Sequence, residues 1–254
     1  MKVASWNVNS IRVRLEHVLE WLNDAQPDVL GLQELKLPTD DFPIEAFANI
    51  GYKSLVNGQK TYNGVALLAR TEGADPILDL PEFEDPQRRV VAATYGDTRI
   101  INLYVPNGQA VGSDKYEYKL SWLEALHNWV AQEVSNHEKL CVFGDFNIAP
   151  KDADVHDPKS WEGKILCSEK ERAALNGLLD LGLQDSFRLF DHPPESFSWW
   201  DYRMAGFRRN RGLRIDLILA SSKVATTASA AGIDKEPRAL ERPSDHAPVW
   251  LEFE

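Results

Sequence analysis

Short apolar runs that end in a carboxylate or an amide side chain constrain the fold of this chain more than any other feature. The clearest are Val3–Trp6 followed by Asn7, Asp28–Gln33 followed by Glu34, and Leu140–Phe143 followed by Asp145 and Asn147. Such runs without strict alternation are typical of strands buried on both faces. Because α/β sheets build sites at the carboxyl ends of their strands, we expect these polar side chains to contribute to one site.

Similar runs, bounded by turn residues, recur along the whole chain and predict nine strands. They are Val3–Trp6, Asp28–Gln33, Gly64–Ala69, Arg89–Tyr95, Arg99–Val105, Leu140–Phe143, Ser196–Trp200, Ile215–Ala220 and Ala247–Phe253. Helical periodicity predicts helices at Arg12–Leu22, Lys115–Val134 and Glu169–Leu181, with Val13 and Leu120 on apolar faces. The interleaving predicts one mixed α/β domain over residues 1–254. The pattern leaves open how the strands divide into sheets.

The composition narrows the class of protein. A formal net charge of −11 argues against the uniformly basic surface of a non-specific nucleic-acid binder, although a local basic groove remains compatible with it. Two cysteines, Cys141 and Cys167, cannot form a disulfide framework, and no apolar stretch approaches the ~20 residues of a membrane helix. We therefore expect a monomeric, cytoplasmic protein that does not enter a membrane.

The polar residues at the strand ends predict a site for a hard divalent cation, since carboxylate and amide oxygens are ligands of Mg²⁺ and Mn²⁺. Zinc is disfavoured because the six histidines show no close ligand spacing. His246, beside Asp245, is a candidate for binding or protonating an oxyanion. Asp216 lies in an otherwise apolar strand, where an unpaired carboxylate is costly, so we expect it to pair with a histidine.

Taken in order, the motifs of this chain resemble those of the exonuclease III family of Mg²⁺-dependent DNA repair nucleases, within the wider endonuclease/exonuclease/phosphatase superfamily. The resemblance covers essentially the full length. The matching segments are Trp6–Asn9, Leu32–Glu34, Tyr62–Ala66, Tyr104–Gly108, Gly144–Asn147, Trp200–Arg203, Arg214–Asp216 and Ser244–Pro248.

The resemblance implies a four-layered α/β sandwich, with two mixed β-sheets packed face to face and helices on both outer sides. It also implies Mg²⁺-dependent hydrolysis of phosphodiesters, with Mn²⁺ as a substitute, in double-stranded DNA that carries nicks, 3′ blocks or abasic sites. Such hydrolysis needs an activated water, a cation that neutralises the developing charge, and help for the leaving oxygen.

The family's roles carry over residue by residue. Glu34 is implied as the principal metal ligand, with Asn7 and Asp245 beside it. Asp145 is implied to orient or deprotonate the attacking water, and His246, oriented by Asp216, to stabilise the pentacovalent phosphorane. The positions implied to contact the phosphate are Asn107, Asn147 and Tyr104, the last of which also assists the leaving oxygen.

A basic segment points to the DNA backbone. Within Arg203–Arg214, which contains no acidic residue, the arginines are Arg203, Arg208, Arg209, Arg211 and Arg214. A solvated basic loop is one interpretation. We favour a contact with phosphates and an unstacked nucleotide, because Trp199 and Trp200 flank the segment.

The resemblance also places Trp199, Leu213 and Ile215 around a small apolar pocket for the sugar of an abasic site. Leu213 stands where some members have Trp, and Leu35 follows Glu34 where many have Thr. Leu166 falls where several abasic endonucleases have a small residue, and its bulk is expected to narrow the path of a flipped-out nucleotide. We therefore predict 3′-end processing at least as strong as incision at abasic sites.

Two other functions fit a chain of this superfamily. A phosphatase of small phosphorylated substrates would have no need of the arginine-rich segment. A non-catalytic nucleic-acid-binding relative would be expected to have lost ligands. All the implied catalytic positions are filled, namely Asn7, Glu34, Asp145, Asn147, Asp216 and His246.

Overall fold

Two six-stranded sheets lie face to face at the centre of the structure, a computed structural model that describes residues 1–254. The first sheet has the order β13 (Ala228–Ile233), β14 (Val249–Phe253), β1 (Lys2–Asn7), β2 (Val29–Gln33), β4 (Val65–Ala69) and β3 (Lys53–Asn57). The second has the order β5 (Ala74–Ile77), β6 (Val90–Tyr95), β7 (Thr98–Tyr104), β8 (Lys139–Asp145), β12 (Asp216–Ser221) and β9 (Leu183–Asp185). Both are mixed sheets, because β1–β2 and β7–β8 are parallel pairs and the other pairs are antiparallel.

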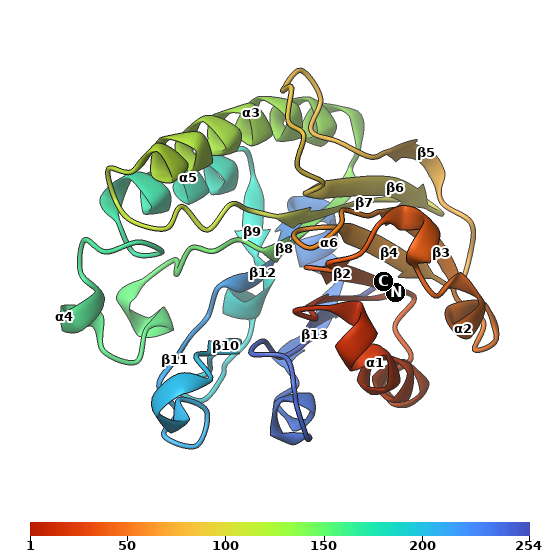
Figure 1. The fold of residues 1–254 in the computed structure, drawn as a ribbon. Helices are drawn as coiled ribbons and strands as arrows, with labels where there is room; N and C mark the ends of the chain where they lie inside the picture. The colour runs from red at the N-terminus through yellow and green to blue at the C-terminus, as the bar shows by residue number, and fades with distance from the viewer.

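Helices cover both outer faces of the sheet pair (Figure 1). One face carries α1 (Ile11–Ala25) and α2 (Ile44–Ala48), and the other carries α3 (Asp114–Asn136) and α5 (Glu169–Asp180). Shorter elements are α4 (Pro158–Trp161), α6 (Ser222–Thr227), the ribbon β10 (Trp199–Trp200) with β11 (Gly212–Leu213), and 3₁₀ turns at Thr39–Asp41, Asp152–Asp154, Ser186–Leu189, Arg203–Ala205 and Glu236–Ala239. The predicted four-layered α/β sandwich is therefore confirmed.

Three apolar cores separate the four layers, which explains the strands without alternation. Phe143 lies in the core between the two sheets. Trp6 and Trp21 lie in the core between the first sheet and the helices α1 and α2. Trp122 and Leu178 lie in the core between the second sheet and the helices α3 and α5. Because both faces of each central strand are buried, apolar residues occupy successive positions rather than every second one.

The structure departs from the sequence-based prediction at several elements. Strands β3, β5, β9, β11 and β13 were not predicted, and the predicted strand Ser196–Trp200 is reduced to the two residues of β10. Val13 was assigned wrongly to a buried face, since it is 40% exposed. Leu120 is only half-buried, and the neighbouring Lys119 is fully buried in the same helix.

Cys141 and Cys167 are both free and buried, as expected for a chain without disulfides. None of the helices combines the length and the apolar composition that crossing a bilayer requires. The amino group of Met1 donates to the carbonyl of Phe253, so the two termini lie together, as Figure 1 also shows.

Candidate active site

Polar side chains from both sheets converge at one end of the sandwich. In the second sheet, Tyr104, Asp145 and Asp216 are direct neighbours across β7, β8 and β12. In the first sheet, Asn7 ends β1, and Glu34 follows β2, which runs parallel beside it. The register of the strands thus brings together residues that are far apart in the sequence.

His246 joins this group from the segment before β14. Its Nδ1 lies 2.9 Å from Oδ2 of Asp216, and its Nε2 lies 3.8 Å from Oδ2 of Asp145. Ser198 donates to Oδ2 of Asp216 at 2.6 Å, which fixes the carboxylate from the other side. The histidine that pairs with Asp216 is therefore His246, the one that the resemblance implied.

Asp145 ends β8, directly after a residue whose backbone position only glycine permits. Gly144 has φ +149°, and a Cβ atom there would lie 1.8 Å from the carbonyl oxygen of Leu103. Beyond the strand, Nδ2 of Asn147 donates to Oδ2 of Asp145 at 3.2 Å, and its backbone N–H donates to Oδ1 of Asp145 at 2.9 Å. The amide of Asn107 donates to Oδ1 of Asn147 at 2.9 Å. The three side chains therefore form one hydrogen-bonded row.

Glu34 receives donors on both carboxylate oxygens. Tyr104 Oη and Asn7 Nδ2 donate to Oε1 at 3.0 and 2.9 Å, and Lys36 Nζ lies 2.8 Å from Oε2. Asn7 Nδ2 also donates to Oδ2 of Asp145 at 2.9 Å. Asn7 acts here as a donor, so it would have to turn its amide to offer Oδ1 to a cation.

Ligand atoms of Glu34, Asp145 and His246 all lie within 4.8 Å of one another. Asp245 is outside this group, because its two oxygens accept from Asn9 Nδ2 at 2.8 Å and Trp199 Nε1 at 3.0 Å. Against the effect of burial, His246 and these donors hold the pKa of Asp245 below its usual range. Asp245 therefore lies beside the group of Glu34, Asp145 and His246, but both of its oxygens already accept hydrogen bonds from other side chains.

Burial and neighbouring charges shift the pKa values of Asp145, His246 and Tyr104. Burial raises the pKa of Asp145 to about 7, even though His246 lowers it. Burial by itself would lower the pKa of His246, but the carboxylates of Asp216 and Asp145 raise it to about 10. Burial, Glu34 and Asp145 hold the pKa of Tyr104 well above its usual range, so Tyr104 remains a donor at neutral pH.

The arginine-rich segment is less uniform than its sequence indicates. Arg203, Arg208, Arg209 and Arg211 are exposed, and Arg203 pairs with Asp201 at 2.7 Å. Assigning Arg214 to a DNA-contacting edge was wrong. Arg214 is buried, and its guanidinium is held by Asp154 at 2.7 Å and Asp185 at 2.6 Å.

The two tryptophans beside this segment, Trp199 and Trp200, differ in their exposure. Trp200 is fully buried, with its Nε1 donating to Asn210, and cannot stack on a nucleotide. Trp199 is half-buried and packs against an apolar cluster made of Ala149, Val155, Leu166, Cys167, Leu213 and Ile215.

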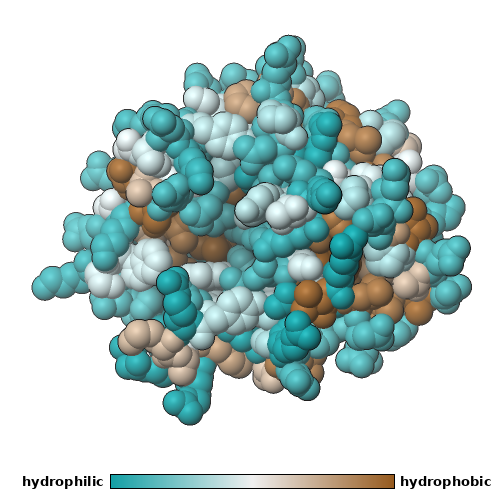
Figure 2. Space-filling model, viewed as in Figure 1, coloured by the Kyte–Doolittle hydropathy of each residue, from teal (hydrophilic) through white to brown (hydrophobic).

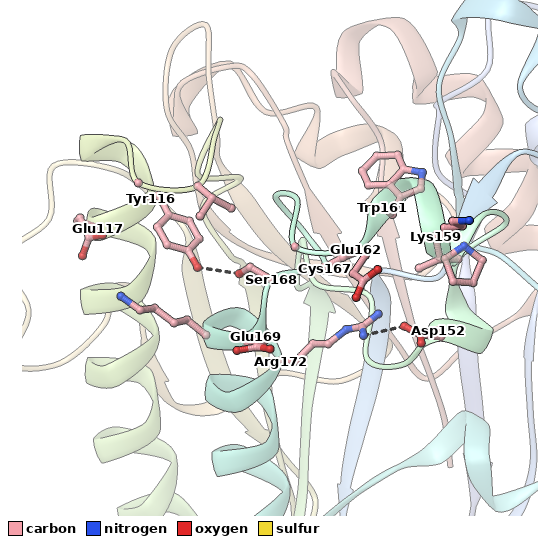
Figure 3. Close-up of a pocket in the computed structure, with 16 residues that line it drawn as sticks. Tyr116, Glu117, Asp152, Lys159, Trp161, Glu162, Cys167, Ser168, Glu169 and Arg172 are labelled. Atoms are coloured by element: carbon pink, nitrogen blue, oxygen red, sulfur yellow. Dashed lines mark hydrogen bonds and ion pairs between the residues drawn. The ribbon is translucent and has the colours of Figure 1, made fainter.

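The residues predicted to line a pocket for an abasic sugar therefore come together in this cluster. The cluster is closed, since Leu166, Leu213 and Ile215 are 5%, 0% and 2% exposed. Figure 2 shows a mostly hydrophilic face with a hollow left of centre whose floor is hydrophobic. A groove of about 720 Å³, lined in part by Val155, Trp161 and Cys167, borders the cluster (Figure 3).

Sequence reasoning missed four residues that hold the site. Ser198 fixes Asp216, and Asn9 fixes Asp245. Lys119 and Glu171 form a buried ion pair next to Asn147. The signal for Lys119 was present, because it stands three residues after Tyr116 and four before Leu123, on the buried stripe of its helix.

The sequence profile of the endonuclease/exonuclease/phosphatase family matches residues 4–246, and the chain belongs to this family. It is 39% identical to exodeoxyribonuclease III of Haemophilus influenzae, with 100% of both chains covered. Among solved structures, it is 50% identical to the 3′-5′ exonuclease NExo of Neisseria meningitidis, with a TM-score of 0.98 and 100% of both chains covered. It is 36% identical to an AP endonuclease of Archaeoglobus fulgidus, with a TM-score of 0.96 and coverage of 100% of this chain and 99% of the other.

Proposed function

We propose that this chain is a Mg²⁺-dependent DNA repair nuclease that hydrolyses phosphodiesters of duplex DNA. Its activities are 3′→5′ exonuclease and 3′-end processing, together with incision 5′ to abasic sites. The observation that carries the proposal is the meeting of Glu34, Asp145 and His246 within 4.8 Å. The similarity to exodeoxyribonuclease III and to a Neisseria 3′ phosphatase bound to a DNA hairpin supports DNA as the substrate.

In the proposed reaction, Asp145 takes a proton from the water that attacks phosphorus, and the bond from phosphorus to the 3′ oxygen breaks. A carboxylate whose pKa is about 7 is matched to this task near neutral pH. Nε2 of His246 donates to a non-bridging oxygen of the phosphorane, while Asp216 keeps the ring oriented. Asn107 and Asn147 hold the phosphate, and Tyr104 assists the leaving oxygen.

The group fits a hard cation, since it offers the carboxylate oxygens of Glu34 and Asp145 and contains no cysteine. Asn7 would add its amide oxygen once it has turned the Nδ2 that it now directs at Glu34 away. Glu34 would hold Mg²⁺ or Mn²⁺, with Asn7 and Asp145 beside the cation. Asp245 would lie further from it, because Asn9 binds one of its oxygens. Bound there, the cation supplies positive charge against the oxygens of the phosphate. Lys36, which now neutralises one oxygen of Glu34, would share that carboxylate with it.

We propose that 3′-end processing is at least as strong as incision at abasic sites. The closed packing of Leu166 against Leu213 and Ile215 supports this, because a flipped-out sugar would need the space that these side chains fill. The exposed residues Arg203, Arg208, Arg209 and Arg211 are proposed to contact the DNA backbone, with Trp199 beside the lesion.

The test is a panel of duplexes that carry a nick, a 3′-phosphate or an abasic-site analogue, each incubated with Mg²⁺ and with EDTA. We expect cleavage that EDTA abolishes, with the nicked and 3′-phosphate duplexes processed at least as fast as the abasic duplex. Binding without cleavage would contradict the nuclease. Much faster incision of the abasic duplex would contradict the order of activities.

We further propose that the protein acts as a monomer in the cytoplasm. Two free, buried cysteines are in keeping with a reducing compartment. Sedimentation of the purified protein with and without a nicked duplex tests the oligomeric state, and a dimer in either sample would contradict it.

A further inference from the structure

We propose that Lys119 is a positioning residue, and that its buried ion pair with Glu171 sets the places of Asn107 and Asn147. This inference rests on the proposed function, in which the two asparagines hold the scissile phosphate. It adds a residue of α3 that does not touch the substrate and acts only through the backbone of the two asparagines.

All three protons of the Lys119 ammonium have an acceptor. Nζ donates to the backbone carbonyl of Asn147 at 2.7 Å, to that of Asn107 at 3.2 Å, and to Oε1 of Glu171 at 2.5 Å. The asparagines follow different strands, β8 and β7. Lys119 therefore ties together two loops whose side chains meet in the hydrogen bond from Asn107 to Asn147.

Glu171 in turn fixes the loop before α5. Its carboxylate accepts from the backbone N–H groups of Leu166 and Ser168 at 3.0 and 3.1 Å, and from the Ser168 hydroxyl at 2.6 Å. The Ser168 hydroxyl is also 2.7 Å from Oη of Tyr116, the contact that Figure 3 draws between α3 and α5. The ion pair thus connects the loop that carries Leu166 with the two asparagines.

Stability alone does not explain a pair in this position. Both side chains are 0% exposed, and such a pair often contributes no more than apolar residues of the same volume would. What apolar residues cannot do is direct two carbonyl groups from different loops to one point. We therefore assign the pair to geometry, in a site where a displacement of 1 Å can reduce a rate about 10²-fold.

The same helix supplies a matched control. Arg99 and Glu133 form a second buried ion pair, at 2.8 Å, between β7 and the end of α3. Glu133 also accepts from Trp129, and neither charged partner contacts a residue of the site. Replacing either pair by apolar residues removes a buried ion pair from α3, but only one replacement releases the asparagines.

The experiment compares Lys119→Met/Glu171→Leu with Arg99→Met/Glu133→Leu, using the full chain, a nicked duplex and Mg²⁺. Tm, the affinity for the duplex and the single-turnover rate constant are measured for both. We expect the first variant to lose about 10²-fold in the rate constant with a small change in affinity. The control should stay within about threefold of wild type, the scatter that context gives to such effects.

Equal rate constants in the two variants would overturn the inference. If the first variant does not fold, Glu171→Gln decides. It keeps the shape of the side chain, but its NH₂ group replaces one carboxylate oxygen and so removes the acceptor of two donors, either Lys119 Nζ and the Leu166 N–H or the Ser168 N–H and hydroxyl. We expect it to fold and to lose about 10-fold in the rate constant, and an unchanged rate constant would overturn the inference. An inactive wild type would instead contradict the proposed function, so the two failures are distinguishable.

Discussion

Nδ1 of His246 lies 2.9 Å from Oδ2 of Asp216, and both side chains are buried. The contact points Nε2 of the ring toward Asp145, 3.8 Å away. An acid, a histidine and a second acid are therefore aligned across the end of the sandwich. Because the carboxylate of Asp216 also accepts from the Ser198 hydroxyl, it cannot turn away from the ring of His246. The orientation of His246 is thus set by the protein before any substrate binds.

Asp216→Asn is expected to reduce the turnover number about 10²–10⁴-fold. The amide removes the charge that keeps His246 protonated, and its NH₂ group favours the wrong tautomer of the ring. The measurement is the single-turnover rate on a 3′-phosphate duplex. Asp234→Asn, which removes a remote carboxylate that accepts from Trp21, serves as the control and should be unaffected. An active Asp216→Asn protein would show that His246 needs no orientation.

Asp145→Asn should reduce the rate constant by about 10²–10⁴-fold or more, since a general base typically contributes this much. The affinity for DNA should remain nearly intact. The amide keeps an oxygen that accepts from the backbone N–H of Asn147, so the backbone that follows β8 keeps this hydrogen bond. Rates and the binding of a nicked duplex are measured on the same preparation. Undiminished activity would refute the role of Asp145, and a parallel loss of binding would make it a phosphate contact.

The positions of the main site residues could be predicted because strand ends are local features of the sequence. Asn7, Glu34 and Asp145 all end or follow a strand that the apolar pattern marks. The weaker strands could not be found in this way. The residues of β5, Ala74–Ile77, are mostly exposed, and they form a strand because they pair with the neighbouring strand β6.

The partners of the supporting residues could not be predicted, because they lie far away in the sequence, even where the helical spacing indicates that a residue such as Lys119 is buried. Arg214 was counted with its exposed neighbours, yet Asp154 and Asp185 enclose it. Lys119 was not singled out in the sequence, because its partner in the core, Glu171, lies on another helix. Local charge counts are informative about the surface only where no buried partner exists.

Glu34→Gln is expected to weaken the binding of Mg²⁺ and to be partly rescued by higher Mg²⁺ or Mn²⁺. The amide retains one oxygen for Tyr104 but loses the negative charge that attracts a cation. Activity is measured against metal concentration after dialysis with EDTA. Glu72→Gln, at an exposed ion pair with Lys53, is the control. If titrating the metal restores nothing, Glu34 does not act mainly as a ligand.

The two thiols are expected to be unreactive in the native protein at pH 8. Burial raises the pKa of Cys141 to about 12 and that of Cys167 to about 11, so the reactive thiolate is scarce well below those values. A thiol-specific reagent should modify neither cysteine before denaturation and both after it. Fast modification of a native thiol that Cys167→Ser removes would mean that the apolar cluster around Leu166 opens in solution.

Leu166→Gly is expected to raise abasic-site incision relative to 3′-end processing by about 10-fold, the effect of a few methylene groups in a pocket. Leu166 has φ +70°, which glycine adopts without strain, and its side chain fills the cluster beside Leu213 and Ile215. The variant also leaves a cavity, which costs about 2–5 kcal/mol of stability. Leu175→Ala, in the core under α5, makes a similar cavity away from the site and should leave the ratio of activities unchanged. The ratio is measured on abasic and 3′-phosphate duplexes in one reaction. An unchanged ratio in Leu166→Gly would mean that the side chain moves aside in the wild type, and that the balance of activities is set elsewhere.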